Sequence, residues 1–320
     1  MRIAVDVMGG DYAPSELIAG ALRWTEEQRG TAILVGQSDL IEQELNSQTY
    51  DSTRVEIAHA SQVVEMNESP AQAMRKKKDA SIIVATNLVK AGQADALVSC
   101  GSTGAQMAAA IFILGRMKGI DRPPIVASLP NAADSVTLLI DVGANVDCKP
   151  VQLLQFALLG SAYAVLQFNK QNPSIALLNN GEEETKGNSV SVEAHTLLKQ
   201  HPQLNFVGNL EGRDLFSGKV DVVLCDGFTG NIVLKTVEGL AGFIAHGVTR
   251  ELGALPQFFS RIDYTKVGGA PLLGVNGISV VGHGSSRREA VYNAMLVAEN
   301  CVTRNMVTEQ ISALQAILAE

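Results

Sequence analysis

The stretch "DVVLCDGFTGNIVLK", residues 221–235, decides the fold. An apolar run with β-branched residues leads into a polar turn with two glycines, and a helical pattern follows the turn. Strand, turn and helix in this order form the repeating unit of α/β sheets. Because the same order recurs along the chain, the stretch predicts an α/β fold.

Apolar runs and longer helical patterns alternate over the whole sequence. We expect strands at 3–7, 32–35, 55–58, 96–99, 125–128, 136–142, 175–178, 206–207, 220–225 and 278–281. We expect helices at 14–28, 79–91, 103–117, 150–169, 190–200, 231–251, 286–303 and 307–318. This alternation predicts a mostly parallel sheet. The "NAAD" turn at 131–134 predicts one hairpin, so the sheet is mixed.

The length of 320 residues suits one α/β domain or two lobes flanking a cleft. No linker rich in Pro, Gly or Ser marks a boundary, so we predict a single α/β domain over 1–320. Residues 250–277 are the least regular part of the chain. The uncharged stretch 151–168 nearly reaches the length of a membrane span, but its glutamines favour a buried core or dimer-interface helix.

Charge and cysteine usage exclude several classes of protein. The net charge of −8 argues against a nucleic-acid partner. The four cysteines are scattered, which argues against a structural zinc site and fits reduced thiols in the cytosol. The start, "MRIAVDVMGGD", lacks the apolar region of a signal peptide.

Six apolar runs end in polar turns, most of them rich in glycine. The turns are "DVMGGD" (6–11), "SCGSTGA" (99–105), "DVGAN" (141–145), "NNGEEETKGN" (179–188), "CDGFTGN" (225–231) and "GHGSS" (282–286). Ligands of open α/β sheets bind beyond the carboxyl ends of the strands. We therefore expect the six turns to line one cleft, with cleft-lining residues Asp6, Gly9, Gly10, Asp11, Asn145, Asp226 and Thr229.

Two of the turns combine hydroxyl side chains with backbone N–H groups at the start of an expected helix, which suits an anion. The candidate phosphate-binding residues are Ser102, Thr103, Gly104, Ser285 and Ser286. The same hydroxyls also serve as helix N-caps, and the two roles are compatible. Lys186 offers positive charge to a phosphate, and Asn231 offers an amide donor to a carbonyl oxygen.

Other chemistries fit these turns less well. "GHGSS" lacks the Gly-x-Ser-x-Gly elbow of serine hydrolases, although Ser285, His283 and an acid are the residue types of a triad. Cys100 and Cys225 at strand ends are interpreted as buried structural thiols. "VMGGDYAP" does not match a dinucleotide-binding fingerprint.

Several motifs in order carry a family resemblance. They are "DVMGGDYAP", "SCGSTGA", "LLNNGEEETKGN", "FVGNLEGRDLFSG", "DVVLCDGFTGNIVLK" and "GGAPLLGVNG" followed by "HGSS". Over residues 3 to 300 the chain resembles the phosphate acyltransferase (PlsX) family of bacterial phospholipid synthesis.

The resemblance implies a three-layer α/β/α sandwich related to isopropylmalate dehydrogenases and phosphotransacetylases. It implies an enzyme that makes acyl phosphate and free carrier protein from fatty acyl-[acyl carrier protein] and inorganic phosphate. A downstream glycerol-phosphate acyltransferase of the membrane uses that product. The resemblance also implies a cytoplasmic homodimer that attaches peripherally to the inner face of the membrane.

The residue chemistry fits direct attack of phosphate on the thioester. The leaving thiol, with a pKa of ~8.5, needs little protonation, and phosphate is itself the nucleophile. On this hypothesis Ser102, Thr103, Ser285 and Ser286 bind phosphate and Lys186 orients it, while Asn231 and His283 polarise the carbonyl.

Metal chemistry is the open point of this hypothesis. The carboxylates of Asp6, Asp11, Asp141 and Asp226 are the ligand type that magnesium prefers. The thioester reaction does not require a metal, so we expect no metal and no cofactor.

Two alternatives stay open. One is a phosphotransacetylase-like enzyme that uses acyl-coenzyme A, and the other is a non-catalytic lipid-binding or scaffold protein with the same fold. An acidic carrier protein needs a basic landing site, and a membrane contact needs apolar side chains beside cations. The candidates for these contacts are Arg250, Leu255, Phe258, Phe259, Arg261 and Lys266.

Overall fold

The computed structural model describes residues 1–256, 259 and 268–318. The chain folds as two compact units, each with its own sheet. Unit 1 comprises Met1–Arg116 and Tyr264–Asn305, and unit 2 comprises Met117–Asp263 and Met306–Glu320.

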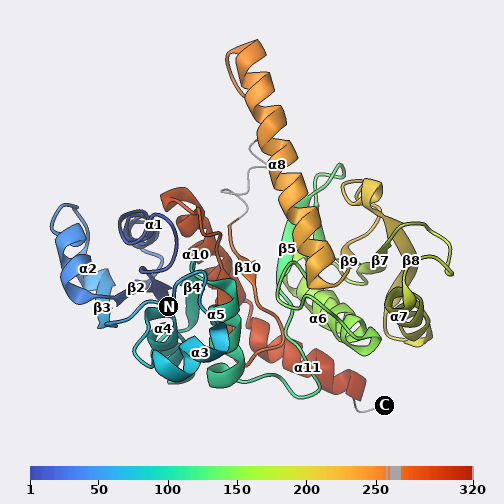
Figure 1. Ribbon diagram of the computed structural model, residues 1–320, viewed down its shortest axis with the longest axis horizontal. Helices are drawn as coiled ribbons and strands as arrows, with labels where there is room; N and C mark the ends of the chain where they lie inside the picture. Colours follow the sequence, from blue (N-terminus) through green and yellow to red (C-terminus); the bar gives the residue numbers. More distant parts are fainter. Residues whose placement is uncertain (257–258, 260–267, 319–320) are drawn as a thin grey trace. The chain divides into compact units, whose positions relative to one another are not determined.

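Unit 1 is built on a six-stranded sheet in the order β10-β11-β4-β1-β2-β3 (Figure 1). Its strands are β1 (Arg2–Asp6), β2 (Thr31–Gly36), β3 (Val55–His59), β4 (Ala96–Ser99), β10 (Ala270–Pro271) and β11 (Ile278–Val281). All neighbours are parallel except β10 and β11. The strand ends of β11, β4 and β1 therefore lie next to each other at one edge.

Helices cover both faces of this sheet, because successive strand residues point to opposite faces. Ala4 and Leu97 pack in one cluster with Ile82 and Ile83 of α4 (Ser81–Lys90). The other face carries α1 (Ser15–Glu26) and α10 (Arg288–Thr303). Smaller helices are α2 (Ser38–Leu45), α3 (Pro70–Lys76) and α5 (Thr103–Ala109), which continues as a π-turn at Ala110–Leu114.

Unit 2 is built on a five-stranded sheet in the order β5-β6-β9-β7-β8. Its strands are β5 (Val126–Pro130), β6 (Val136–Ile140), β7 (Ser174–Asn179), β8 (Asn205–Glu211) and β9 (Val222–Leu224). β5 and β6 form the antiparallel hairpin expected at "NAAD", and the other neighbours are parallel. The helices are α6 (Pro150–Phe168), α7 (Ser189–Gln200), α8 (Gly227–Leu252) and α11 (Met306–Leu318).

Two of the described helices are long and apolar enough to cross a membrane, judged by length and composition. The first, α6, buries ten of its residues, and Gly160 packs closely against Ile140 and Val222. The stretch is therefore a core helix, as the sequence predicted. The second, α8, is different, since Gly227 and Gly230 are its buried residues and its far end extends beyond the sheet (Figure 1).

The predicted α/β class with mostly parallel mixed sheets is confirmed, with three corrections. There are two sheets and not one. The sequence did not predict α2, α3 or β10, which are short. The helix expected from residue 231 begins at Gly227, because the Asp226 side chain accepts a hydrogen bond from the Thr229 N–H and caps it.

Candidate functional site

Three of the predicted turns meet in unit 1, after the adjacent strands β1, β4 and β11. The Asp11 N–H donates to the Gly284 carbonyl at 2.8 Å. A Cβ on Gly9 would lie 2.8 Å from Gly101 Cα, and one on Gly10 would lie 3.1 Å from the Gly284 oxygen. The backbones approach so closely that only glycine fits at these positions. The turns "DVMGGD", "SCGSTGA" and "GHGSS" thus form one continuous surface.

Asp6 holds this edge together from inside. Its side chain is buried and accepts hydrogen bonds from Ser99 Oγ at 2.8 Å and the Met8 N–H at 3.3 Å. Burial raises the pKa of the Asp6 carboxyl, and these hydrogen bonds oppose that effect. Asp6 therefore links β1 to β4 beneath the turns. Ser99 was missed by the sequence reasoning, because a serine that ends a strand carries no pattern of its own.

The "GHGSS" turn is closed by its own hydrogen bonds. The His283 N–H donates to Ser286 Oγ at 3.1 Å, and the Ser286 N–H donates to the His283 carbonyl at 2.9 Å. Ser286 is only 2% exposed, so its hydroxyl serves the turn. A phosphate contact by this residue stays a prediction.

His283 and Ser285 lie on the outer side of the turn. Ser285 Oγ lies 2.6 Å from His283 Nδ1, and the Ser285 N–H donates to the same nitrogen at 3.2 Å. Because a backbone N–H is always a donor, Nδ1 is the acceptor. The neutral ring then carries its proton on Nε2, which is the form that donates a hydrogen bond to a carbonyl oxygen.

The candidates of the "SCGSTGA" turn are all partly exposed. Ser102 is the N-cap of α5, and its Oγ accepts a hydrogen bond from the Ala105 N–H at 3.4 Å. Thr103 and Gly104 form the first turn of that helix. A Cβ on Gly104 would lie 2.8 Å from Pro70 Cγ, so the first residue of α3 covers this turn.

In unit 2, Asp141 organises the "DVGAN" turn. Its buried carboxylate accepts hydrogen bonds from the N–H groups of Ile125, Gly143, Ala144 and Asn145, at 2.7 to 3.2 Å. The Asn145 amide also donates to Asp141, at 2.8 Å. Burial raises the pKa of Asp141, while these donors lower it. Asn145 is 2% exposed and belongs to this framework.

Next to this turn, Asn231 is exposed in the first part of α8, and a Cβ on Gly143 would lie 3.8 Å from it. Asp226 and Thr229 form the helix cap, with Thr229 Oγ1 donating to Asp226 at 3.0 Å. Lys186 is half-exposed, and its Nζ lies 4.0 Å from Glu183. The structure thus places Asn231 and Lys186 at the surface of unit 2.

The candidates therefore gather as two sets, one on each unit, and one shared cleft for all six turns stays a prediction. No cluster of three His, Cys, Asp or Glu side chains with metal-ligand geometry exists among the described residues. The carboxylates of Asp6 and Asp141 already accept hydrogen bonds from donor groups of the protein. The expectation that no metal takes part also stays a prediction.

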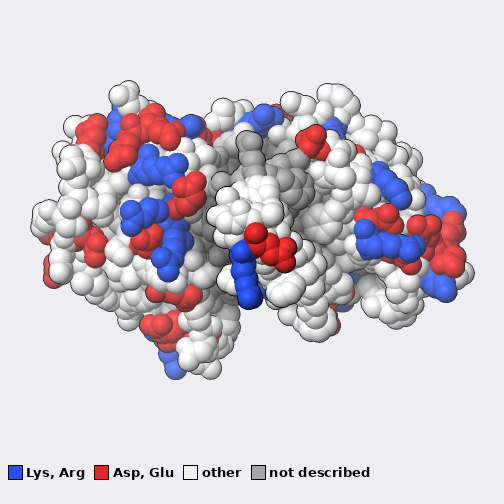
Figure 2. Space-filling view, turned by 90° about the horizontal axis from the view of Figure 1, so that it is seen from above, with Lys and Arg blue, Asp and Glu red and all other residues white. Residues whose placement is uncertain are grey.

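Of the predicted contact residues, Phe258, Arg261 and Lys266 lie outside the described residues. Arg250 and Leu255 are exposed near the end of α8, and Phe259 is partly exposed. Arg288 pairs with Glu16 at 2.8 Å, and Arg287 stacks on Tyr12 with 4.3 Å from guanidinium to ring centre. Lys and Arg side chains lie beside Asp and Glu over most of the charged surface in Figure 2.

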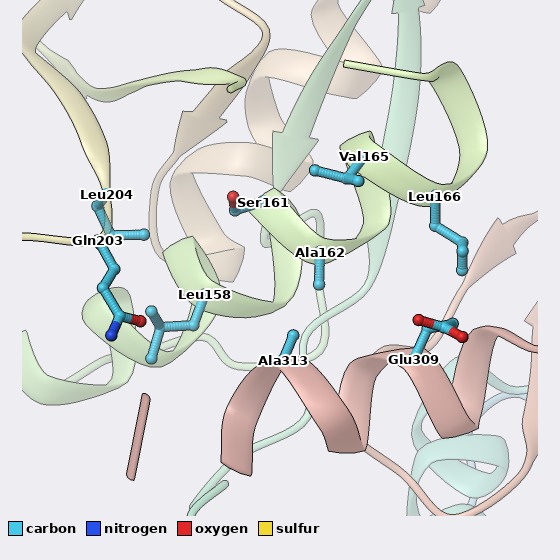
Figure 3. Close-up of a pocket in the computed structure, with 9 residues that line it drawn as sticks. All are labelled: Leu158, Ser161, Ala162, Val165, Leu166, Gln203, Leu204, Glu309 and Ala313. Carbon is cyan, nitrogen blue, oxygen red and sulfur yellow. The ribbon is translucent and has the colours of Figure 1, made fainter. Parts of the chain in front are cut away.

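One small pocket lies within unit 2, away from the strand-end turns. Its volume is about 200 Å³, and α6, α11 and the segment before β8 line it. Ala162 and Ala313 point toward each other across it (Figure 3). The pocket contains none of the candidate residues, so we do not assign it to the reaction.

Comparisons with known proteins decide the family. A family model described as "Fatty acid synthesis protein" matches residues 1–309. A phosphate acyltransferase of Syntrophomonas wolfei is 62% identical over 311 residues, which are 97% of each chain. The chain belongs to the phosphate acyltransferase family. A second member, from Pelotomaculum thermopropionicum, is 51% identical over 99% of this chain and 96% of its own.

Solved structures agree on the fold of this phosphate acyltransferase. A phosphotransacetylase from Streptococcus pyogenes aligns with a TM-score of 0.67 and 18% identity, over 95% of this chain and 94% of its own. A branched-chain phosphotransacylase from Enterococcus faecalis aligns with a TM-score of 0.60 and 17% identity, over 97% and 99% of the two chains. The enzyme is therefore an acyltransferase of fatty acid and phospholipid synthesis on the phosphotransacetylase-like fold that the resemblance implied.

The first prediction concerns the backbone contact between Gly9 and Gly101. We expect Gly9→Ala to lower the free energy of unfolding by about 1–3 kcal/mol, because the added methyl has no space. Gly212→Ala is the matched control, since a Cβ there meets nothing within 4 Å. Urea unfolding measures both variants, and equal stability of the two would contradict the close packing.

The second prediction concerns the thiols. Burial raises the pKa of Cys100 and of Cys148 to about 12 each, and raises that of Cys225 as well. At pH 8 the first two are thiolate in roughly one molecule in 10⁴. We expect negligible iodoacetamide labelling of the folded enzyme at pH 8 and full labelling after unfolding. Rapid labelling of Cys100 or Cys225 in the folded state would contradict this prediction and support a catalytic role for that thiol.

Proposed function

We propose that the enzyme transfers a fatty acyl group from acyl carrier protein to inorganic phosphate, and that the product feeds a glycerol-phosphate acyltransferase. The observation that carries this proposal is the meeting of three turns at one edge of unit 1, with His283 and Ser285 beside them. Family membership supports the acyl transfer.

In the proposed reaction a phosphate oxygen attacks the thioester carbonyl carbon. The C–O bond forms, the C–S bond breaks, and the electron pair leaves with the thiolate, which water protonates. The "SCGSTGA" and "GHGSS" turns bind phosphate, and the Nε2–H of His283 donates to the carbonyl oxygen as negative charge develops there. Lys186 and Asn231 keep their predicted roles toward phosphate and carbonyl. The reaction uses no cofactor and no metal.

Ser285 has a more defined role than the sequence suggested. Its N–H and hydroxyl both meet Nδ1 of His283, so it fixes the ring tautomer in addition to any contact with phosphate. The buried thiols support direct attack, because their raised pKa values disfavour a covalent acyl-cysteine.

The third prediction tests this mechanism by phosphate-dependent release of thiol from acyl carrier protein and from acyl-coenzyme A. We expect acyl phosphate, trapped as the hydroxamate, mainly from the carrier substrate.

Variants test the roles of single residues in the same assay. Loss of the carbonyl donor in His283→Ala reduces kcat by about 10². Lys186→Met raises KM for phosphate, and Lys199→Met is its control, because Lys199 pairs with Glu184 on the surface of unit 2.

Three results would contradict this proposal. Preference for coenzyme A would make the enzyme phosphotransacetylase-like, and absence of release from either substrate would indicate a scaffold. An acyl-enzyme isolated after acid quench would replace direct attack by a covalent mechanism.

We further propose a cytoplasmic homodimer that attaches peripherally to the membrane. Its support is α8, where Ile232, Leu240 and Phe243 are 50%, 56% and 77% exposed. These three lie within about 80° of one another around the helix axis, at about 100° per residue. So large an apolar stripe on an otherwise solvated helix is typical of an association surface.

The fourth prediction is that Phe243→Glu weakens the dimer by at least about tenfold, because it places a carboxylate in the apolar stripe. Thr249→Glu is the control, exposed on the same helix and about 120° around it. Light scattering after size exclusion measures the mass. Liposome flotation of the same variants separates the two surfaces, and unchanged mass with lost flotation would assign the stripe to lipid.

A further inference from the structure

The segment between β3 and α4 carries the longest run of cations in the sequence, "RKKK" at 75–78. Pro70 begins α3, and no acid lies between Pro70 and Lys78. Neither the expected strands nor the expected helices included this segment. The proposed function described above gives this segment no role.

Most of this charge is not neutralised within the protein. Lys77 pairs with Glu68 at 2.7 Å, and Lys78 Nζ donates to the Met74 carbonyl at 2.8 Å. Arg75 and Lys76 are exposed. In the part of the chain that the structure describes, Arg75, Lys76 and Lys78 have no carboxylate within ion-pair distance. We call these three residues the α3 patch.

The acids that flank the segment do not compensate for the patch. The Asp79 carboxylate accepts a hydrogen bond from the Ser61 N–H at 2.8 Å, and Glu68 is occupied by Lys77. Glu65 is exposed. Several other cations of unit 1 are paired, for example Arg29 with Glu27 at 2.7 Å. The patch is therefore a local excess of positive charge on a chain of net charge −8.

The same segment lies on the turns proposed to bind phosphate. A Cβ on Gly284 would lie 3.1 Å from Met66 Cε, and one on Gly104 would lie 2.8 Å from Pro70 Cγ. α3 packs beside α5 in unit 1 (Figure 1). The segment that carries the patch therefore contacts two of the turns proposed to bind phosphate, through Met66 and Pro70.

We propose that the α3 patch docks an acidic protein, which on the proposed function is the carrier protein that presents the thioester. Complementary charge steers such a partner and orients it at the site. A lipid surface fits less well, because Met66 is the one large apolar side chain exposed within residues 61–80. This docking site is in a different part of the chain from Arg250, Arg261 and Lys266, where the sequence predicted contact with the carrier protein or the membrane.

The test compares Arg75→Glu/Lys76→Glu with Lys90→Glu/Lys118→Glu. The control removes the same charge from two exposed cations that lack an ion pair among the described residues. Binding of carrier protein to immobilised enzyme is measured over a salt series, with thermal unfolding to confirm folding. We expect the patch variant to raise Kd about tenfold at low salt and to flatten the salt dependence. We expect the control to stay within about twofold.

Each outcome is decisive. If wild-type enzyme binds the carrier and the patch variant keeps its Kd within about twofold, docking at α3 is wrong. If the variant instead loses binding to phosphatidylglycerol vesicles, the patch is a lipid contact. The proposed function fails separately, through absence of phosphate-dependent thiol release by wild-type enzyme. Should the reversal variant unfold, Arg75→Gln/Lys76→Gln replaces it, with a smaller increase in Kd expected.

Discussion

The structure of unit 1 depends on close backbone contacts between the turns that follow its strands. Gly9 meets Gly101, and Gly10 meets Gly284 and Cys100, at distances that leave no space for a side chain. Beneath them, the buried Asp6 accepts from Ser99 and connects the two central strands. The turn that carries His283 is one of these turns, since Gly284 packs on Gly10 and Ser285 and Ser286 hydrogen-bond to His283.

In unit 2 a buried carboxylate fixes the shape of the corresponding turn. Asp141 gathers four backbone N–H groups, so the turn after β6 is shaped by hydrogen bonds to one buried side chain. Asn231 then stands at the surface beside Gly143. In both units a buried aspartate shapes the turn, and the exposed residues next to it are the ones available to a substrate.

The chemistry of these edges agrees with an acyl transfer that needs no protein nucleophile. In the proposed reaction a thioester and phosphate supply the electrophile and the nucleophile, so the protein has to position them and to offset charge. Ser286 closes its turn, the thiols of Cys100 and Cys225 are buried, and the tautomer of His283 is set by Ser285. The longest run of cations on this acidic chain lies at 75–78, at the end of α3.

The α/β class, most strand positions and the glycine turns could be read from the sequence, because local hydrophobic period and turn chemistry decide them. The order of motifs was sufficient for the family. The start of α8 was placed too late, since "DGFTG" resembles a turn while Asp226 in fact caps a helix. The short helix α3 was missed because seven residues carry too little periodicity.

What only the tertiary structure decided are contacts between residues far apart in the chain. Ser285 and Ser286 are adjacent serines, yet one is buried in its own turn and the other meets His283. Whether a hydroxyl is buried depends on what packs over it, and no local pattern encodes that. The sequence by itself determined which elements form and which family they belong to. Packing determined that Gly9 lies on Gly101 and Pro70 on Gly104, because those contacts join segments that only the folded sheet brings together.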